Sequence, residues 1–348
     1  MTAGPSPAPQ ELAEVLDPGW LSWALGHRHP GCEVAGTAVV ETLQTVATKV
    51  RFVVDYHRPG DPPAPAALCV KGYFHEEGRR RPGAGIVETS FYRELAASVR
   101  ARVAPCVYTG IDGTTGHGIV VMEDLVRAGA RFLTALSPYS VDQAAATLDQ
   151  LARLHAASWG AAGLDAPWLA PKLEMLTLAV DAARLQELMD RPRAGGLPSW
   201  VRDGQRIHAA LEQLASAPPP AAACLVHGDV HAGNVFETAS GPGLIDWQLV
   251  QRGSWAMDVA YHIGAVLDTD ERRRSESALL GHYLDRLSAY GIEPPAWDEA
   301  VAGYRRYLAY GLYLWAMTQF VEEPVTTQFV RRLGHAVVDN GTFELLGV

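Results

Sequence analysis

The pattern of apolar and polar residues changes character about a third of the way along the chain. The first third holds short runs rich in Val and Thr between Gly- and Pro-rich turns, which is the pattern of an antiparallel sheet. The predicted strands cover residues 33–43, 47–56, 67–72, 107–109 and 118–122. From Ser140 onward, apolar residues recur every three or four positions, as on one face of a helix. The pattern therefore predicts an α+β fold, with a small sheet-containing lobe and a larger, mainly helical lobe.

The domain boundaries follow from the same pattern. Residues 1–10 are rich in Pro and Ala and are predicted to form a disordered tail. Residues 11–125 form the predicted first lobe, and residues 126–348 form the second. The apolar stretch 307–321 is too short to span a bilayer, so we expect it to be a buried helix and expect no membrane association.

Polar side chains suited to metal and proton chemistry gather within residues 225–248. Asp229 and Asn234 follow one apolar run and Asp246 follows the next, so all three are expected at strand ends around a hairpin-like turn over residues 239–243. Carboxylate and amide oxygens are ligands that Mg²⁺ accepts, and a second carboxylate can take the proton of a substrate hydroxyl. This division assigns catalysis to Asp229 and the metal to Asn234 and Asp246, as in phosphoryl transfer.

A zinc hydrolase is the alternative interpretation of the same stretch. His227, Asp229 and His231 alternate along the chain, and imidazole and carboxylate groups at close spacing suit zinc. The sequence offers no HxxxH helix and no Cys pair elsewhere to complete such a site. Phosphoryl transfer explains more of the stretch, with His227 as a structural hydrogen-bonding residue. His231 stays open between an exposed loop residue and a phosphate contact.

Two charged residues of the first lobe extend the phosphoryl-transfer interpretation. Lys71 ends a predicted buried strand, and Glu88 begins a predicted helix over residues 88–102. Each alone is most simply a solvated charge, but together they form a pair able to hold the α- and β-phosphates of a nucleotide. Glu94 is the rival partner, although its side chain points to another side of the helix. The segment that leaves the last strand would offer backbone groups to an adenine edge, and its residues are Met122, Glu123, Asp124 and Leu125.

These motifs, in this order, resemble the aminoglycoside phosphotransferase and choline kinase group, which are small-molecule relatives of the protein kinases. HGDVHAGN followed by IDW resembles the catalytic motif, CVKG the third-strand lysine, VETSFYREL the helix glutamate, VVMEDL the hinge and LARLHAASW the helix before the catalytic loop. The resemblance runs from about residue 45 to 290 and implies a bilobal, protein-kinase-like fold. It favours Glu88 over Glu94, and it implies that Asp258 braces the catalytic loop. The IDWQ ending and the FY after Glu88 lean toward the ecdysteroid-kinase-like branch.

Two features depart from the pattern of this family. The loop expected to cover the nucleotide, residues 43–48, has no glycine, although glycine lets a backbone approach phosphate most easily. The hydroxyls of Thr45 and Thr48 are the expected substitutes. Trp247 follows the metal aspartate in place of Phe-Gly, so no activation loop of the protein-kinase type is expected.

The charge and composition of the chain limit the classes of molecule that it is expected to bind. The formal net charge of −10 disfavours nucleic acid, and the N-terminal residues lack the features of a signal peptide, so a cytoplasmic protein is expected. The sequence thus predicts an ATP-dependent O-phosphotransferase, with Mg²⁺ and with GTP as an alternative nucleotide, acting as a monomer or homodimer on a small-molecule hydroxyl. An antibiotic and a steroid-like or other metabolite alcohol are the candidate acceptors. Six aromatic residues are available to line the acceptor pocket, although core packing is the commoner role: Trp168, Trp200, Trp255, Tyr304, Tyr307 and Trp315.

Overall fold

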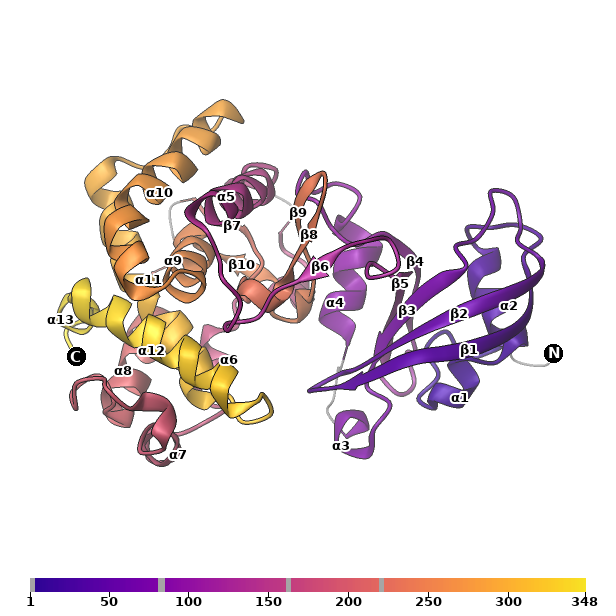
Figure 1. Ribbon diagram of the computed structural model, residues 1–348, viewed down its shortest axis with the longest axis horizontal. Coiled ribbons are helices and arrows are strands. Elements are labelled where there is room, and N and C mark those ends of the chain that lie inside the picture. The colour runs from indigo at the N-terminus through magenta and orange to yellow at the C-terminus, as the bar shows by residue number, and fades with distance from the viewer. Residues whose placement is uncertain (1–3, 81–84, 161–163, 219–221) are drawn as a thin grey trace. The chain divides into compact units, whose positions relative to one another are not determined.

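The computed structural model describes residues 4–80, 85–160, 164–218 and 222–348 (Figure 1). The chain divides into two compact units. Unit 1 comprises residues 1–98 and 103–131, and unit 2 comprises residues 99–102 and 132–348. The change of composition near residue 125 therefore precedes the structural boundary by a few residues, because the turns after the last strand still belong to unit 1.

Unit 1 is built on a five-stranded antiparallel sheet with the strand order β1-β2-β3-β5-β4. The alternation predicted from the sequence is clearest in β2, where Val50, Phe52 and Val54 face the core and the residues between them do not. Gln44 pairs with Thr48, so residues 45–47 form the tight turn of the first hairpin. The strands are β1 (Glu33–Gln44), β2 (Thr48–Arg58), β3 (Ala67–Gly72), β4 (Cys106–Ile111) and β5 (Gly118–Glu123).

One predicted helix of unit 1 ends early, and the helical segment near the N-terminus is interrupted. Pro18 begins a new helix, whose first amides donate to the side chain of Asp17, and the segment before it forms only one turn. The helix predicted over residues 88–102 changes to a π-helical turn after Ser90 and ends at Leu95. The elements are α1 (Leu12–Val15), α2 (Pro18–Gly26), α3 (Glu76–Arg79), α4 (Ile86–Ser90) and the π-helical turn η1 (Phe91–Leu95).

The prediction of a disordered tail is wrong for residues 4–10. Ala8 is 1% exposed, and the hydroxyl of Tyr108 donates to the carbonyl of Pro7 at 2.8 Å. The indole N–H of Trp20 donates to the carbonyl of Ser6 at 2.9 Å. Proline has no amide N–H, so this segment needs few acceptors. The side-chain donors of Trp20 in α2 and Tyr108 in β4 bind its carbonyl groups and hold it in place.

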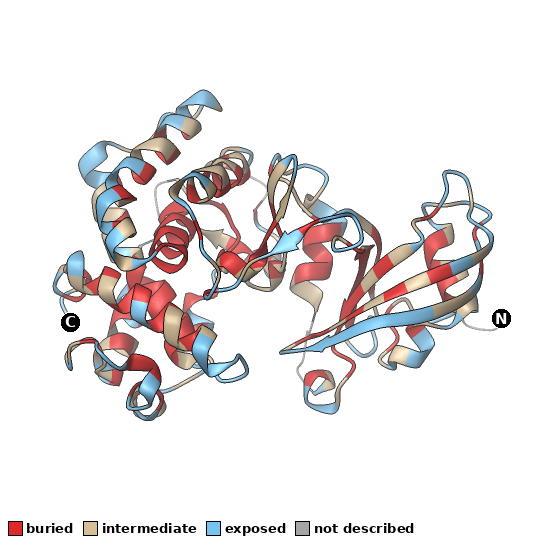
Figure 2. Cartoon of the chain, in the orientation of Figure 1, coloured by how far each residue is buried: buried red, intermediate tan, exposed pale blue. Residues whose placement is uncertain are grey.

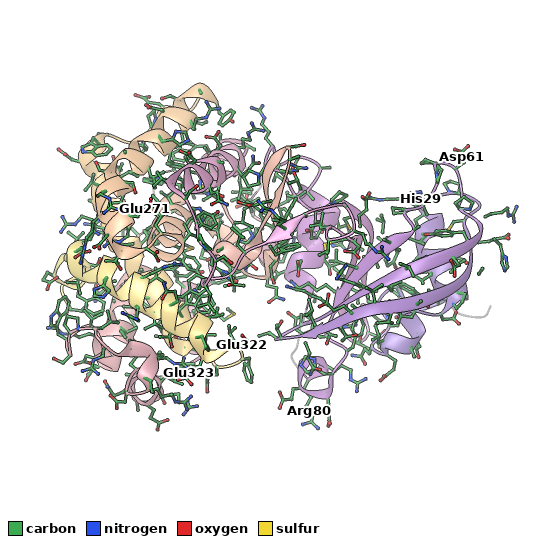
Figure 3. The ribbon with its side chains drawn as sticks, viewed as in Figure 1. His29, Asp61, Arg80, Glu271, Glu322 and Glu323 are labelled. Atoms are coloured by element: carbon green, nitrogen blue, oxygen red, sulfur yellow. The ribbon has the colours of Figure 1, made fainter. Side chains whose placement is uncertain are left out.

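Two loops of unit 1 also lie side by side. His29, between α2 and β1, lies near Asp61 of the second loop (Figure 3). Its Nδ1 donates to the carbonyl of Pro62 at 2.8 Å. The amide of Asp61 returns a bond to the carbonyl of Pro30 at 3.1 Å. These bonds satisfy backbone groups of both loops, which have no strand partner.

Unit 2 is a helical assembly around α9, whose residues are all buried (Figure 2). The capping box predicted from Ser140 and Gln143 is present at the start of α5. The apolar stretch 307–321 is helical only to Met317, and the residues after Gln319 are exposed. No helix in the described part of the chain is both long enough and apolar enough to cross a membrane. The α-helices are α5 (Val141–Ala156), α6 (Leu173–Thr177), α7 (Ala182–Met189), α8 (Gly204–Ser216), α9 (Trp255–Val266), α10 (Thr269–Ala289), α11 (Trp297–Met317), α12 (Glu323–Asp339) and α13 (Thr342–Leu346).

Short strands and single turns of 3-10 helix form the rest of unit 2. Strand β7 pairs with β10, and β8 pairs with β9 in the predicted hairpin, which turns at residues 239–240. The described elements are β7 (Cys224–Val226), β8 (Val235–Thr238), β9 (Gly241–Leu244), β10 (Gln251–Gly253), η2 (Pro167–Leu169), η3 (Pro192–Ala194), η4 (Ala232–Asn234) and η5 (Trp247–Leu249). The short strand β6 (Arg131–Phe132) spans the unit boundary and neighbours β8.

Candidate functional site

Asp258, a fully buried residue of α9, binds the backbone of the loop from β7 to η4. Its carboxylate accepts hydrogen bonds from the backbone amides of His227 and Gly228, at 2.7 and 2.8 Å, and from Nε2 of His155 at 3.0 Å. Burial acts to raise the pKa of Asp258, but the hydrogen bond and charge of His155 hold that pKa below its ordinary value. Asp258 therefore lies where the resemblance expects a brace for this loop.

Gly228 is required by the shape of the same loop. Its φ is +80°, and a Cβ there would stand 2.5 Å from the carbonyl oxygen of Leu249. The hydroxyl of Tyr310, from α11, donates to the Gly228 carbonyl at 2.6 Å. Two helices thus fix the loop. Asp258 of α9 binds the amides of His227 and Gly228, and Tyr310 of α11 binds the carbonyl of Gly228.

His227, which the sequence predicts to be a structural residue, bonds to the backbone through both ring nitrogens. Its Nε2 donates to the carbonyl of Ile245 at 2.9 Å, and its Nδ1 accepts from the amide of Asp229 at 3.2 Å. Burial lowers the pKa of His227, which keeps the ring neutral with one donor and one acceptor nitrogen. Both nitrogens are engaged by the backbone, so neither is placed to bind zinc.

The zinc interpretation finds no further support in the geometry. Within the described residues, no group of three or more His, Cys, Asp and Glu side chains is placed to hold a metal ion. His231 Nδ1 accepts from the amide of Gly233 at 3.0 Å, and its Nε2 lies 3.9 Å from Oδ1 of Asp229. His231, which the sequence left open, is therefore the N-cap residue of η4 and packs beside the catalytic candidate.

Asp229 presents its carboxylate at the mouth of the loop. Its Oδ2 accepts a hydrogen bond from Nδ2 of Asn234 at 3.0 Å, and its side chain is 27% exposed. Burial, and then the negative charge of Asp246, raise the pKa of Asp229 to about 6. A carboxylate with this pKa is a stronger base than a solvated aspartate and remains ionised at neutral pH.

Asn234 and Asp246 occupy neighbouring positions at the open end of the β8–β9 hairpin. Val235 pairs with Leu244, and the amide of Ile245 donates to the carbonyl of Asn234 at 3.0 Å. The side-chain nitrogen of Asn234 donates to Asp229, which directs the amide oxygen away from that carboxylate. Asp246 has a φ of +69°, the only described non-glycine residue with positive φ. Such a conformation is uncommon and is typical of functional positions.

In unit 1, the structure brings Lys71 and Glu88 together. Lys71 Nζ lies 2.6 Å from Oε2 of Glu88, and their side chains are 3% and 4% exposed. Glu94 instead pairs with Arg93 at the surface. The choice of Glu88 over Glu94 agrees with this geometry.

Thr48 and Asp124 were also predicted to contact the nucleotide, and both have other contacts within unit 1. The hydroxyl of Thr48 lies 3.4 Å from Nδ1 of His75, beside the turn of the first hairpin. The Asp124 carboxylate binds Arg51 and the amides of Val126 and Arg127, so it caps a turn.

The backbone of the same segment is partly committed to the protein. The amides of Glu123 and Asp124 donate to the carbonyls of Pro105 and Ala67, at 2.9 and 3.0 Å. These two amides are therefore already bonded and do not serve the predicted contact with an adenine edge, and Met122 as a whole residue is 9% exposed.

Two residues that contact the site were not predicted as site residues. Tyr261 donates to Oδ1 of Asp229 at 3.1 Å, and Trp315 Nε1 donates to the hydroxyl of Tyr261 at 2.7 Å. Tyr261 lies three residues after Asp258, so the spacing of one helical turn was a usable signal. Nothing in the sequence connects Trp315, on another helix, to Asp229.

The aromatic residues considered for the acceptor pocket divide into two groups. Trp255, Tyr304 and Trp315 are buried in the core of unit 2. The other three are only partly buried, namely Trp168, Trp200 and Tyr307. The burial of Trp255 and Tyr304 favours core packing, whereas Trp315 combines packing with its hydrogen bond to Tyr261.

Comparison with known proteins gives a consistent result. A family model described as "Phosphotransferase enzyme family" matches residues 79–304, which is more than half of the chain. Thiamine kinase of Escherichia coli (strain SMS-3-5 / SECEC) is 37% identical over 93 residues, which cover 26% of this chain and 29% of that protein. The chain thus matches less than a third of the length of these curated relatives.

Solved structures of low identity share the fold. An amicoumacin kinase, in complex with AMP-PNP, Ca²⁺ and Ami, is 13% identical, with a TM-score of 0.54, and the match covers 86% of this chain and 88% of that one. A choline kinase from Cryptosporidium parvum Iowa II is 11% identical, with a TM-score of 0.51 and 92% of both chains covered. At this identity the likeness shows a kinase-like α+β fold.

Proposed function

Because this chain belongs to the phosphotransferase enzyme family, we propose that it transfers the γ-phosphoryl group of ATP to a hydroxyl of a small molecule. The observation that carries the proposal is the arrangement of Asp229, Asn234 and Asp246 around the open end of the β8–β9 hairpin. It combines one solvent-accessible base with two hard oxygen donors, which is the set of groups that phosphoryl transfer needs.

Asp229 is the proposed catalytic base. It orients the acceptor hydroxyl and takes its proton as the oxygen bonds to the γ-phosphorus and the bond from that phosphorus to the β-phosphate oxygen breaks. The products are the phosphorylated alcohol and ADP, and the proton rests on Asp229. The raised pKa of this carboxyl suits the role, because a stronger base takes the proton more readily.

Asn234 and Asp246 are the proposed ligands of Mg²⁺. The donor chemistry fits, because an amide oxygen and a carboxylate are the oxygen ligands that Mg²⁺ accepts, and the amide nitrogen of Asn234 is already directed to Asp229. When bound, Mg²⁺ supplies charge neutralisation at the phosphates. Asp258 and His227 support the loop that carries Asp229, and neither is proposed to touch the substrate.

Lys71 is the proposed contact of the α- and β-phosphates, oriented by Glu88. A buried ammonium paired with a carboxylate at 2.6 Å is held in one position, which is what electrostatic stabilisation of a polyphosphate requires. Thr48 and the backbone at Glu123 and Leu125 are the proposed further nucleotide contacts. GTP remains an alternative donor.

The acceptor is proposed to be an antibiotic or a metabolite alcohol. The names of the similar proteins, which include a thiamine kinase, a choline kinase and an amicoumacin kinase, support a small-molecule acceptor and do not select one.

The test is an assay with Mg-ATP and Mg-GTP against a panel of alcohols: aminoglycosides, macrolides, nucleoside antibiotics, thiamine, choline and sterols. ADP release and the mass of the product are measured, with Asp229→Asn as the matched control. We expect a mass increase of one phosphoryl group on one acceptor class and its loss in the control. A wild-type protein that neither binds nor consumes nucleotide, and that holds stoichiometric zinc, would contradict the proposal.

A further inference from the structure

Asp229 is held by a side chain that has no place in the scheme described so far. The hydroxyl of Tyr261 donates to Oδ1 of Asp229 at 3.1 Å, while Nδ2 of Asn234 donates to Oδ2 at 3.0 Å. Tyr261 belongs to the buried helix α9 and has no exposed surface. One donor on each oxygen fixes the plane of the carboxylate, and each oxygen keeps a second lone pair for an acceptor hydroxyl.

A third residue sets the direction of the bond between Tyr261 and Asp229. Nε1 of Trp315 donates to the hydroxyl oxygen of Tyr261 at 2.7 Å. An indole N–H can only donate, so the Tyr261 oxygen must accept there, and its single proton is directed to Asp229. Successive hydrogen bonds also polarise one another, which makes the hydroxyl a better donor. We call this chain, Trp315 to Tyr261 to Asp229, the Trp–Tyr relay.

The surrounding helices hold both rings of the Trp–Tyr relay in place. Trp315 stacks on Phe329 of α12 with ring centroids 4.0 Å apart, and His231 packs edge-on against it. A Cβ at Gly311 of α11 would stand 2.8 Å from Cδ2 of Tyr261, so the missing side chain there admits the tyrosine ring. Rings packed in this way have few alternative rotamers, which suits a positioning role.

We propose that Tyr261, oriented by Trp315, is a positioning residue that holds the Asp229 carboxylate in the orientation from which it takes the proton of the acceptor hydroxyl. The inference rests on the proposed function, because it assigns Tyr261 a part in the same proton transfer. Tyr261 acts through Asp229, whereas Lys71, the proposed phosphate contact, belongs to unit 1. Loss of Tyr261 therefore lowers kcat and leaves the KM for ATP unchanged.

The matched comparison is Tyr261→Phe against Tyr313→Phe. Tyr313 is also fully buried and lies on α11, but its hydroxyl donates to the carbonyl of Leu176 at 2.5 Å and has no bond to Asp229. We expect Tyr261→Phe to lower kcat about 10-fold and Tyr313→Phe to keep the wild-type kcat. Trp315→Phe should lower kcat about threefold, because the tyrosine hydroxyl remains but is no longer oriented. The assay uses Mg-ATP with the alcohol found in the acceptor screen, or with water as the acceptor.

Double variants separate positioning from a general loss of structure. In the Asp229→Asn background, Tyr261→Phe should cause no further loss of turnover, because the group through which it acts is already changed. Multiplicative losses in the double variant, or equal losses in the Tyr261 and Tyr313 variants, would contradict the positioning role.

A second measurement does not depend on activity. Urea unfolding of the wild type, Tyr261→Phe, Asp229→Ala and the double variant should be non-additive by about threefold or more in the unfolding equilibrium constant. Additive effects of the two substitutions on stability would contradict the Trp–Tyr relay. This test does not require a measurable phosphotransferase activity. A wild type that transfers phosphate to no acceptor, water included, would instead contradict the proposed function.

Discussion

Acid should destabilise this protein through His262, a fully buried residue of α9. Its Nδ1 donates to the carbonyl of Val230 at 2.9 Å, and its Nε2 has no hydrogen-bond partner among the described residues. The ring of Tyr139 lies edge-on against it. Protonation would create a second N–H with no acceptor and a charge in the core. Burial therefore lowers the pKa of His262 to about 4. The Val230 carbonyl and the Asp258 charge oppose this with smaller raising effects, and the His231 ring adds a small lowering effect.

The size and sign of the effect follow from linkage. In the unfolded chain the imidazole binds a proton near its ordinary pKa of about 6.5, whereas in the folded protein it stays neutral down to pH about 4. The unfolded state therefore binds more protons between these values, and the free energy of unfolding falls as the pH falls. The loss attributable to His262 is about 2 kcal/mol at pH 5 and about 3 kcal/mol at pH 4, from 1.36 kcal/mol per pKa unit.

Urea unfolding at pH 7 and pH 5 measures this loss when the wild type is compared with His262→Asn. The asparagine amide can keep the bond to the Val230 carbonyl but does not titrate. Other groups contribute to the pH dependence of both proteins, so the difference between them isolates His262. We expect the wild type to lose about 2 kcal/mol more than the variant on acidification. Equal losses in the two proteins would refute the reasoning.

Three further changes test the other packing arguments. Asp258→Asn removes the charge that holds the amides at His227 and Gly228, and we expect kcat to fall about 100-fold with native circular dichroism. Glu88→Gln leaves the buried ammonium of its partner without a counter-charge, so urea unfolding should show a loss of about 3 kcal/mol, whereas the exposed Glu94→Gln should change stability by less than about 1 kcal/mol. Gly311→Ala places a methyl group 2.8 Å from the Tyr261 ring and should lower kcat in a steady-state assay, and an unchanged rate would speak against the packing that holds this ring.

Local patterns determined much of unit 1 and of the loop that carries Asp229. The strands of the sheet were predictable because alternation along a strand reflects which face is buried, and that is written in consecutive residues. The start of α5 was predictable because a capping box uses side chains only three residues apart. Asn234 and Asp246 flank a single hairpin, β8–β9, so their proximity also follows from consecutive residues.

Two local patterns of unit 1 did not match the structure. The N-terminal residues have the composition of a disordered tail, yet aromatic donors from α2 and β4 fix them. The helix after Glu88 has a good apolar period, yet it changes to a π-helical turn and stops at Leu95.

The chemistry at Asp229 shows the same division. The sequence by itself identified Asp229, Asn234 and Asp246 as candidate site residues, because their types and spacing suffice to recognise a phosphotransferase motif. Only the tertiary structure decided which groups hold them: both nitrogens of His227 face the backbone, and a tryptophan on α11 directs a tyrosine on α9 to the carboxylate of Asp229. The reason is physical, because a hydrogen bond depends on the position of two atoms within a few tenths of an ångström. Residues far apart in the chain reach such positions only through the packing of whole helices, which no local period records.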